Sequence, residues 1–82
     1  MCSDDNDDLR SIFYNNIGMC YIRLEEWEKA KDSYTKALEI NEHYLKARKN
    51  RIKCYQKLDL YDDCFKEMKI VIQQEGPTKE NL

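Results

Sequence analysis

Four lysines recur at three- and four-residue spacing in the second half of the chain. They are Lys46, Lys49, Lys53 and Lys57. A helix turns by about 100° per residue, so these lysines and Asn50 would share about a quarter of its circumference. Like charges at this spacing repel each other, and no acidic residue lies between His43 and Leu58. The stripe is suited to charge-assisted hydrogen bonds with carboxylates; the alternative interpretation is a solvated lysine face.

Two asparagines, Asn16 and Asn50, add amide chemistry to the lysines. Each side-chain amide offers both donors and an acceptor, so a pair of them can hold the backbone of an extended peptide. The alternative is that both are surface residues bonded locally or to water. The predicted peptide-binding site has five members: Asn16, Lys46, Lys49, Asn50 and Lys53.

Other reactive residues do not form a pattern that indicates catalysis. The single histidine, His43, is expected to be a surface or capping residue, because no partner groups for it are apparent. The four cysteines include no C-x-x-C pair, which argues against a zinc site. We interpret them as small apolar fillers, with a regulatory thiol as the alternative. We therefore expect no enzymatic activity, no metal and no cofactor.

The elements that position these residues follow from an internal repeat of 34 residues. The offset pairs Asn16 with Asn50, Cys20 with Cys54, Tyr21 with Tyr55 and Leu24 with Leu58. A fixed period of this size is typical of stacked helical hairpins. Apolar and small residues at three- and four-residue spacing within each copy indicate helices rather than strands. The predicted fold is all-α, with four helices in two antiparallel helix-turn-helix hairpins.

The expected organisation has four parts. They are an acidic leader at 1–8, a first hairpin at 9–44, a second hairpin at 45–78, and a tail or the start of a missing cap at 79–82. Asp7 or Asp8 is expected to cap the first helix. The helices are expected at 9–23, 27–40, 43–58 and 61–75, and Gly76 with Pro77 should end the last one. Two repeats are fewer than the roughly three that such arrays usually need, so we expect a piece of a longer protein. The alternative is a natural two-repeat protein that pairs through its ends.

Residues 11–44 resemble a tetratricopeptide repeat. The matching positions are Tyr14, Ile17, Gly18, Tyr21, Trp27, Ala30, Tyr34 and Ala37. The second copy, 45–78, is looser and has Arg48, Arg51 and Ile52 where Tyr14, Ile17 and Gly18 stand in the first copy. The resemblance implies an α-solenoid that binds other proteins, with the first helix of each hairpin, and hence the lysine stripe, lining a concave groove.

Asn16 and Lys46 are similar to two residues of the carboxylate clamp in co-chaperone members of this family. The clamp's arginine one turn after the lysine is Asn50 here, so the resemblance to the clamp is partial. It implies as partner a protein or peptide with an acidic segment, such as the carboxy-terminal tail of a chaperone.

Composition narrows the classes of partner. The 82 residues carry a net charge of -2, which gives no overall attraction to nucleic acid or to an anionic membrane. No apolar run approaches the roughly 18–20 residues of a membrane span, so we expect a soluble, cytoplasmic protein. The leading hypothesis is an adaptor that binds an acidic segment. The alternatives are a self-assembly module, with homo-oligomers formed through uncapped ends, and, third, a surface that binds single-stranded RNA.

Overall fold

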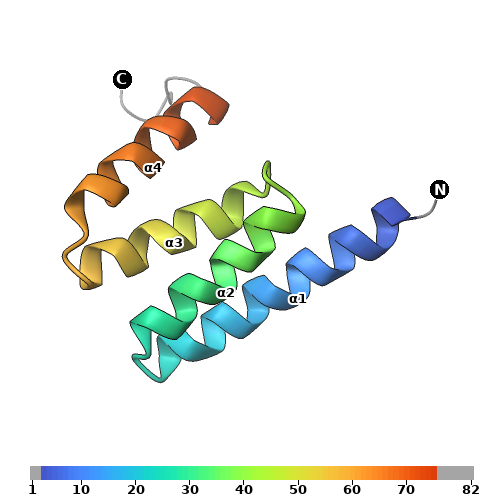
Figure 1. Ribbon diagram of the computed structural model, residues 1–82, viewed down its shortest axis with the longest axis horizontal. Helices are drawn as coiled ribbons and strands as arrows, with labels where there is room; N and C mark the ends of the chain where they lie inside the picture. The colour runs from blue at the N-terminus through green and yellow to red at the C-terminus, as the bar shows by residue number, and fades with distance from the viewer. Residues whose placement is uncertain (1–2, 76–82) are drawn as a thin grey trace.

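The computed structural model describes residues 3–75, and the side chains of residues 7–75. It contains four helices: α1 (Ser3–Arg23), α2 (Trp27–Ile40), α3 (Leu45–Lys57) and α4 (Tyr61–Glu75). Each helix packs mainly against the next one along the chain, and no strand occurs in the described part (Figure 1). The prediction of an all-α fold with two antiparallel hairpins is confirmed. The expected stop at 76–77, the tail at 79–82 and Cys2 lie outside the described residues.

The two hairpins turn in the same way, one repeat apart. Glu25 and Asp59 both have φ of 60°, in the left-handed region. Glu26 N–H donates to the Tyr21 carbonyl at 2.9 Å, and Glu25 N–H donates to the Ile22 carbonyl at 2.9 Å. This pair of bonds is a Schellman motif, which satisfies carbonyls at the end of α1. The equivalent bonds end α3, so the internal repeat extends to the backbone of the turns.

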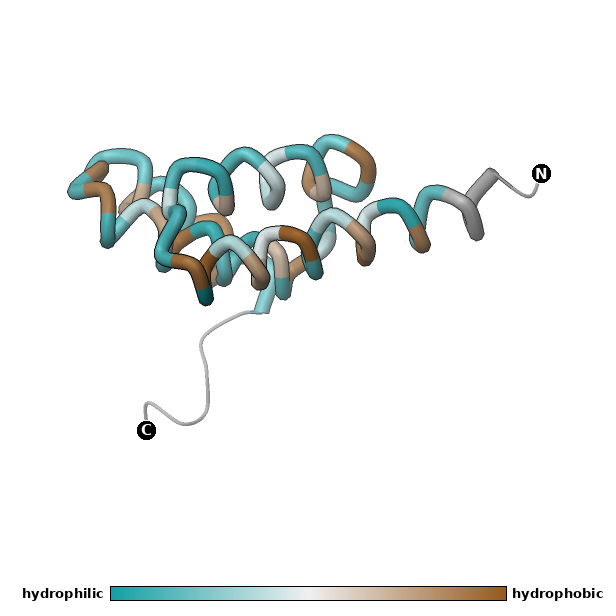
Figure 2. The backbone as a smooth tube through the Cα atoms, turned by 90° about the horizontal axis from the view of Figure 1, so that it is seen from below, coloured by the Kyte–Doolittle hydropathy of each residue, from teal (hydrophilic) through white to brown (hydrophobic). Residues whose placement is uncertain are grey.

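The core lies mainly where α2 packs between α1 and α3. Its buried members are Ala30, Tyr34, Ala37, Leu38, Ala47 and Cys54. Apolar and polar residues alternate along the helices (Figure 2), and the apolar residues of α2 and α4 gather most clearly on one face. Gly18 allows α1 to approach α2 closely. A Cβ at Gly18 would lie 2.6 Å from a ring atom of Tyr34, whose side chain is completely buried.

Two predictions about helix ends were wrong. The first helix begins at Ser3 rather than at Leu9, which is consistent with the favourable effect of aspartates near a helix amino terminus. Asp7 and Asp8 therefore lie inside α1 and do not cap it. The third helix begins at Leu45, two residues later than expected, because the His43 N–H donates to the Asn41 side chain at 3.1 Å in the preceding turn.

Candidate functional site

The lysine stripe lies on α3, and its members differ in what they contact. Lys46 and Lys53 are exposed, and neither forms a salt bridge with another described residue. Lys49 pairs instead with Glu75 at the end of α4. Lys57 lies 5.4 Å from the centre of the Trp27 ring, in a cation–π arrangement. The cations left available for a ligand are therefore Lys46 and Lys53.

The two asparagines of the predicted site differ in whether another side chain already holds them by a hydrogen bond. Asn50 donates from its side-chain nitrogen to the Asn15 side-chain oxygen at 3.2 Å, which connects α3 to α1. Asn15 is almost fully buried, and its own nitrogen lies 3.5 Å from the Met19 sulfur. Asn16 is exposed on α1. Asn50 thus helps to join the two hairpins, whereas the Asn16 side chain is available to a ligand.

Three charged residues join α3 to α4; Arg48 and Glu67 are buried, and Arg51 is nearly so. Arg48 Nη1 lies 3.1 Å from Glu67 Oε1, and Arg51 Nη2 lies 2.7 Å from Glu67 Oε2. All three side chains are 10–13 % exposed. Arg48 also donates to the Glu42 carbonyl at 2.7 Å, and Arg51 donates to the Thr35 hydroxyl at 3.2 Å. This Arg48–Glu67–Arg51 triad connects the turn before α3, the body of α2 and the middle of α4.

The triad explains the departures of the second repeat from the tetratricopeptide pattern. Arg48 and Arg51 stand where the first repeat has Tyr14 and Ile17, and Glu67 stands where it has Ser33. This pattern was a signal of a buried ion pair, because two basic residues occupy apolar positions and an acid stands at the facing position of the next helix. The two arginines stand out in the sequence, whereas the roles of Glu67 and Asn15 were not predicted from it.

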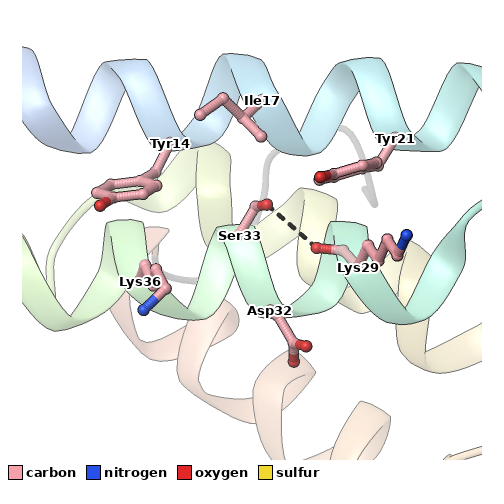
Figure 3. Close-up of a pocket in the computed structure, with 7 residues that line it drawn as sticks. All are labelled: Tyr14, Ile17, Tyr21, Lys29, Asp32, Ser33 and Lys36. Atoms are coloured by element: carbon pink, nitrogen blue, oxygen red, sulfur yellow. Dashed lines mark hydrogen bonds between the residues drawn. The ribbon is translucent and has the colours of Figure 1, made fainter.

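At the same positions of the first repeat there is an open pocket of about 370 Å³ between α1 and α2. In Figure 3, Ser33 points toward α1 between the rings of Tyr14 and Tyr21, near Ile17. The Ser33 hydroxyl donates to the Lys29 carbonyl at 3.1 Å. The lining residues from α2 are Lys29, Asp32, Ser33 and Lys36. The first repeat therefore has a hollow where the second repeat has the ion triad.

A second hollow, of about 330 Å³, lies between α3 and α4. Its walls are apolar apart from two lysines at the rim. The lining residues are Lys49, Ile52, Lys53, Met68, Val71 and Ile72. Met68 and Ile72 are 42 % and 56 % exposed, so this part of α4 is largely uncovered. We refer to this hollow as the α3/α4 groove.

The cysteines occupy both buried and exposed positions. Cys54 and Cys64 are buried, whereas Cys20 is exposed although it occupies the repeat position of Cys54. Burial raises the pKa of the Cys54 thiol to about 11, which keeps it protonated and unreactive at neutral pH. The filler interpretation is therefore confirmed for Cys54 and Cys64, but not for Cys20.

The described residues form neither a metal-binding cluster nor a membrane-spanning helix. No group of three or more His, Cys, Asp or Glu side chains within residues 3–75 is arranged to hold a metal ion. In the same range, every helix is too short or too polar to cross a bilayer.

Comparison with known proteins assigns the class. The sequence profile of the tetratricopeptide repeat matches residues 11–44, the first hairpin. Together with the two helical hairpins and their shared turns, this shows that residues 11–44 form a tetratricopeptide repeat, a motif that mediates interactions between proteins.

Two groups of curated relatives resemble most of the chain. It is 35 % identical, over 74 residues, to the mitochondrial import receptor subunit TOM70 of Rattus norvegicus and to that of Homo sapiens. These matches cover 90 % of this chain but only 12 % of each receptor subunit. Protein unc-45 homolog B of Danio rerio is 25 % identical over 67 residues, which are 82 % of this chain and 7 % of that protein. No solved structure matches the chain significantly.

Proposed function

We propose that the exposed face of α3, together with Asn16 of α1, binds an extended acidic segment of a partner protein. The observation that carries this proposal is that Lys46 and Lys53 are exposed and unpaired among the described residues, while the neighbouring cations have partners. The class of the protein supports a binding role rather than catalysis. The relatives named as import receptor subunits are also binding proteins, which supports the same role.

The spacing of the free cations indicates the form of the ligand. Lys53 follows Lys46 by seven helical positions, which places their Cα atoms about 10 Å apart along α3. An extended peptide advances about 3.3 Å per residue, so acidic groups about three residues apart match the two lysines. A terminal carboxylate next to an acidic side chain satisfies the same geometry over a shorter distance, because lysine side chains are long and flexible. The tail of a chaperone, as implied by the partial resemblance to the carboxylate clamp, is one ligand of this form.

Fluorescence anisotropy with labelled acidic peptides tests the proposal. One peptide carries a free carboxyl terminus and its twin an amidated one. Lys46→Glu should weaken binding by about 1–3 kcal/mol, because it replaces an attractive charge-assisted contact with a repulsive one. The matched control is Lys66→Glu on α4, which makes the same change in net charge away from α3 and should leave binding nearly unchanged.

The outcomes separate the alternatives. A preference for the free terminus supports clamp-like recognition, and equal binding of the twins supports recognition of acidic side chains alone. If Lys46→Glu and Lys66→Glu weaken binding equally, the attraction is nonspecific and the proposed site is wrong. If a folded protein binds neither peptide at low salt, the stripe is a solvated face.

A further inference from the structure

The α3/α4 groove has a counterpart in the first repeat that is already covered. Each residue lining the groove corresponds, 34 positions earlier, to a residue of α1 or α2. The six counterparts are Asn15, Gly18, Met19, Tyr34, Ala37 and Leu38. Five of them are buried, and α3 lies against this surface through Ala47, Asn50 and Cys54. The groove thus lies at the repeat positions of the surface on which α3 rests, but no described helix rests on it.

The pocket between α1 and α2 differs from its repeat counterpart in the opposite sense: it is open in the first repeat, and its counterpart in the second repeat is covered. Its residues Tyr14, Ile17 and Ser33 correspond to Arg48, Arg51 and Glu67, which α2 covers through the contact of Thr35 with Arg51. In the second repeat, α2 of the preceding hairpin therefore covers the residues that correspond to the pocket. In the first repeat that position is open (Figure 3). Within residues 3–75, no helix equivalent to α3 covers the α3/α4 groove, and no helix equivalent to α2 covers the pocket between α1 and α2.

One contact closes both hollows. The repeat equivalent of α3 is α1, and the equivalent of α2 is α4. We propose that the chain self-associates head to tail: α1 of a second copy docks into the α3/α4 groove of the first, in the register that α3 has on the first hairpin. In this arrangement α4 of the first copy covers the tyrosine-lined pocket of the second.

The α1 surface has the side chains that this contact requires. Its apolar stripe consists of Phe13, Ile17, Cys20 and Leu24, at spacings of four, three and four residues. Phe13 and Leu24 are 64 % and 69 % exposed, and Cys20 is also exposed. The equivalents of Phe13 and Cys20 on α3 are Ala47 and Cys54, both completely buried. Phe13 is larger than Ala47, and in the proposed register its ring enters the open hollow of about 330 Å³.

The α4 surface is complementary in the same register. Met68 and Ile72 are exposed, whereas their equivalents Tyr34 and Leu38 are buried in the core where α2 packs between α1 and α3. The hydrogen bond from Asn50 to Asn15 also has an intermolecular equivalent. In the assembly, Lys49 of the first copy lies opposite Asn16 of the second. The Lys49 ammonium has three donors, so it can donate to the Asn16 amide oxygen while it pairs with Glu75, and the contact competes with an acidic peptide for Asn16.

The proposed contact joins two different surfaces, so it is heterologous and leaves one of each surface free at the ends. Such contacts produce open chains or rings rather than closed symmetric dimers. This property gives the proposal a specific test, because a variant that blocks one surface still retains the other.

Sedimentation velocity of the 82-residue chain over a range of concentrations measures the association. Phe13→Glu and Ile72→Glu each place a charge in the proposed contact and should weaken self-association about tenfold or more. The control is Leu9→Glu, on the same helix and one turn away, at a residue that is 65 % exposed. Leu9 corresponds to His43, whose side chain is 79 % exposed beside the contact between α2 and α3, so this variant should associate like the parent chain.

Mixing the two blocked variants tests the head-to-tail geometry. Phe13→Glu retains the groove and Ile72→Glu retains the α1 stripe, so an equimolar mixture should form heterodimers and nothing larger. Alkylation of Cys20, followed by peptide mass spectrometry, reports on the register. Its rate should fall with concentration in the parent chain, as the thiol becomes covered, but not in Phe13→Glu.

A monomeric parent chain at all concentrations overturns the proposal. So does an effect of Leu9→Glu equal to that of Phe13→Glu, or a mixture of the blocked variants that stays monomeric. Unchanged alkylation of Cys20 in an associated sample shows a different contact and also overturns it. Circular dichroism of each variant establishes that the four helices are retained.

Discussion

The most sensitive position for stability is Glu67, because one carboxylate neutralises two buried arginines. Glu67→Gln keeps the shape of the side chain but removes its charge. The remaining carbonyl oxygen can still accept from Arg48 or Arg51, but the new NH₂ group faces the other guanidinium, and both are donors. Breaking a buried pair by removing one partner typically costs about 3–5 kcal/mol. We expect a loss near 3 kcal/mol, because the side chains retain slight exposure.

A loss of this size is a large part of the total, since domains of this length are stable by roughly 4–12 kcal/mol. Urea unfolding, followed by the helical circular dichroism signal, measures the change. The matched control is Glu75→Gln, which removes the carboxylate from Lys49. Lys49 is 50 % exposed and Glu75 28 %, so we expect a loss below about 1 kcal/mol.

A second comparison separates charge from packing. Replacing all three members of the triad with methionine removes the buried charges together, and such replacements are often neutral or stabilising. The triple variant should therefore be more stable than Glu67→Gln. Equal stability of Glu67→Gln and Glu75→Gln would refute the reasoning, since it would mean that the triad is hydrated rather than buried.

Two further predictions concern the backbone. Gly18→Ala should lower stability by about 1 kcal/mol although alanine favours helices, because the new methyl group would lie 2.6 Å from the buried ring of Tyr34 and such overpacking costs about 1–3 kcal/mol; a higher midpoint of thermal unfolding would contradict the close contact. Glu25→Gly should raise stability by about 1 kcal/mol, because glycine adopts φ of 60° without strain. Its control is Glu26→Gly, at φ of -94°, which should give no gain in the same urea titration.

Much of the fold could be predicted from local patterns. The bounds of α2 and α4 agree with the expected ones, because their apolar spacing and turn residues are local signals. The start of α1 could not be placed in this way. A run of aspartates has the composition of a disordered leader, but the same charges favour the amino terminus of a helix, and composition does not decide between the two.

The candidate site was less predictable, because its residues depend on contacts between helices. The sequence places five polar residues on related faces but does not show which are already engaged. Lys49 is paired by Glu75 and Asn50 by Asn15, so each depends on a residue from another helix. Lys46 and Lys53 have no such partner among the described residues, so they remain the members on which the peptide-binding hypothesis depends.

The two repeats have opposite chemistry at one set of equivalent positions. At the positions where a hairpin meets the helix before it, the second repeat has charges and the first has tyrosine, isoleucine and serine. A charged triad tolerates burial only when its partners are fixed, and here Glu42, Thr35 and Glu67 all belong to the same chain. A tyrosine-lined surface that is edged by Lys29, Asp32 and Lys36 requires no fixed ion partner and tolerates solvent when it is uncovered. The junction within the chain therefore has fixed ion partners, whereas the surfaces of α1 and α4 are suited to the contact that we propose between copies.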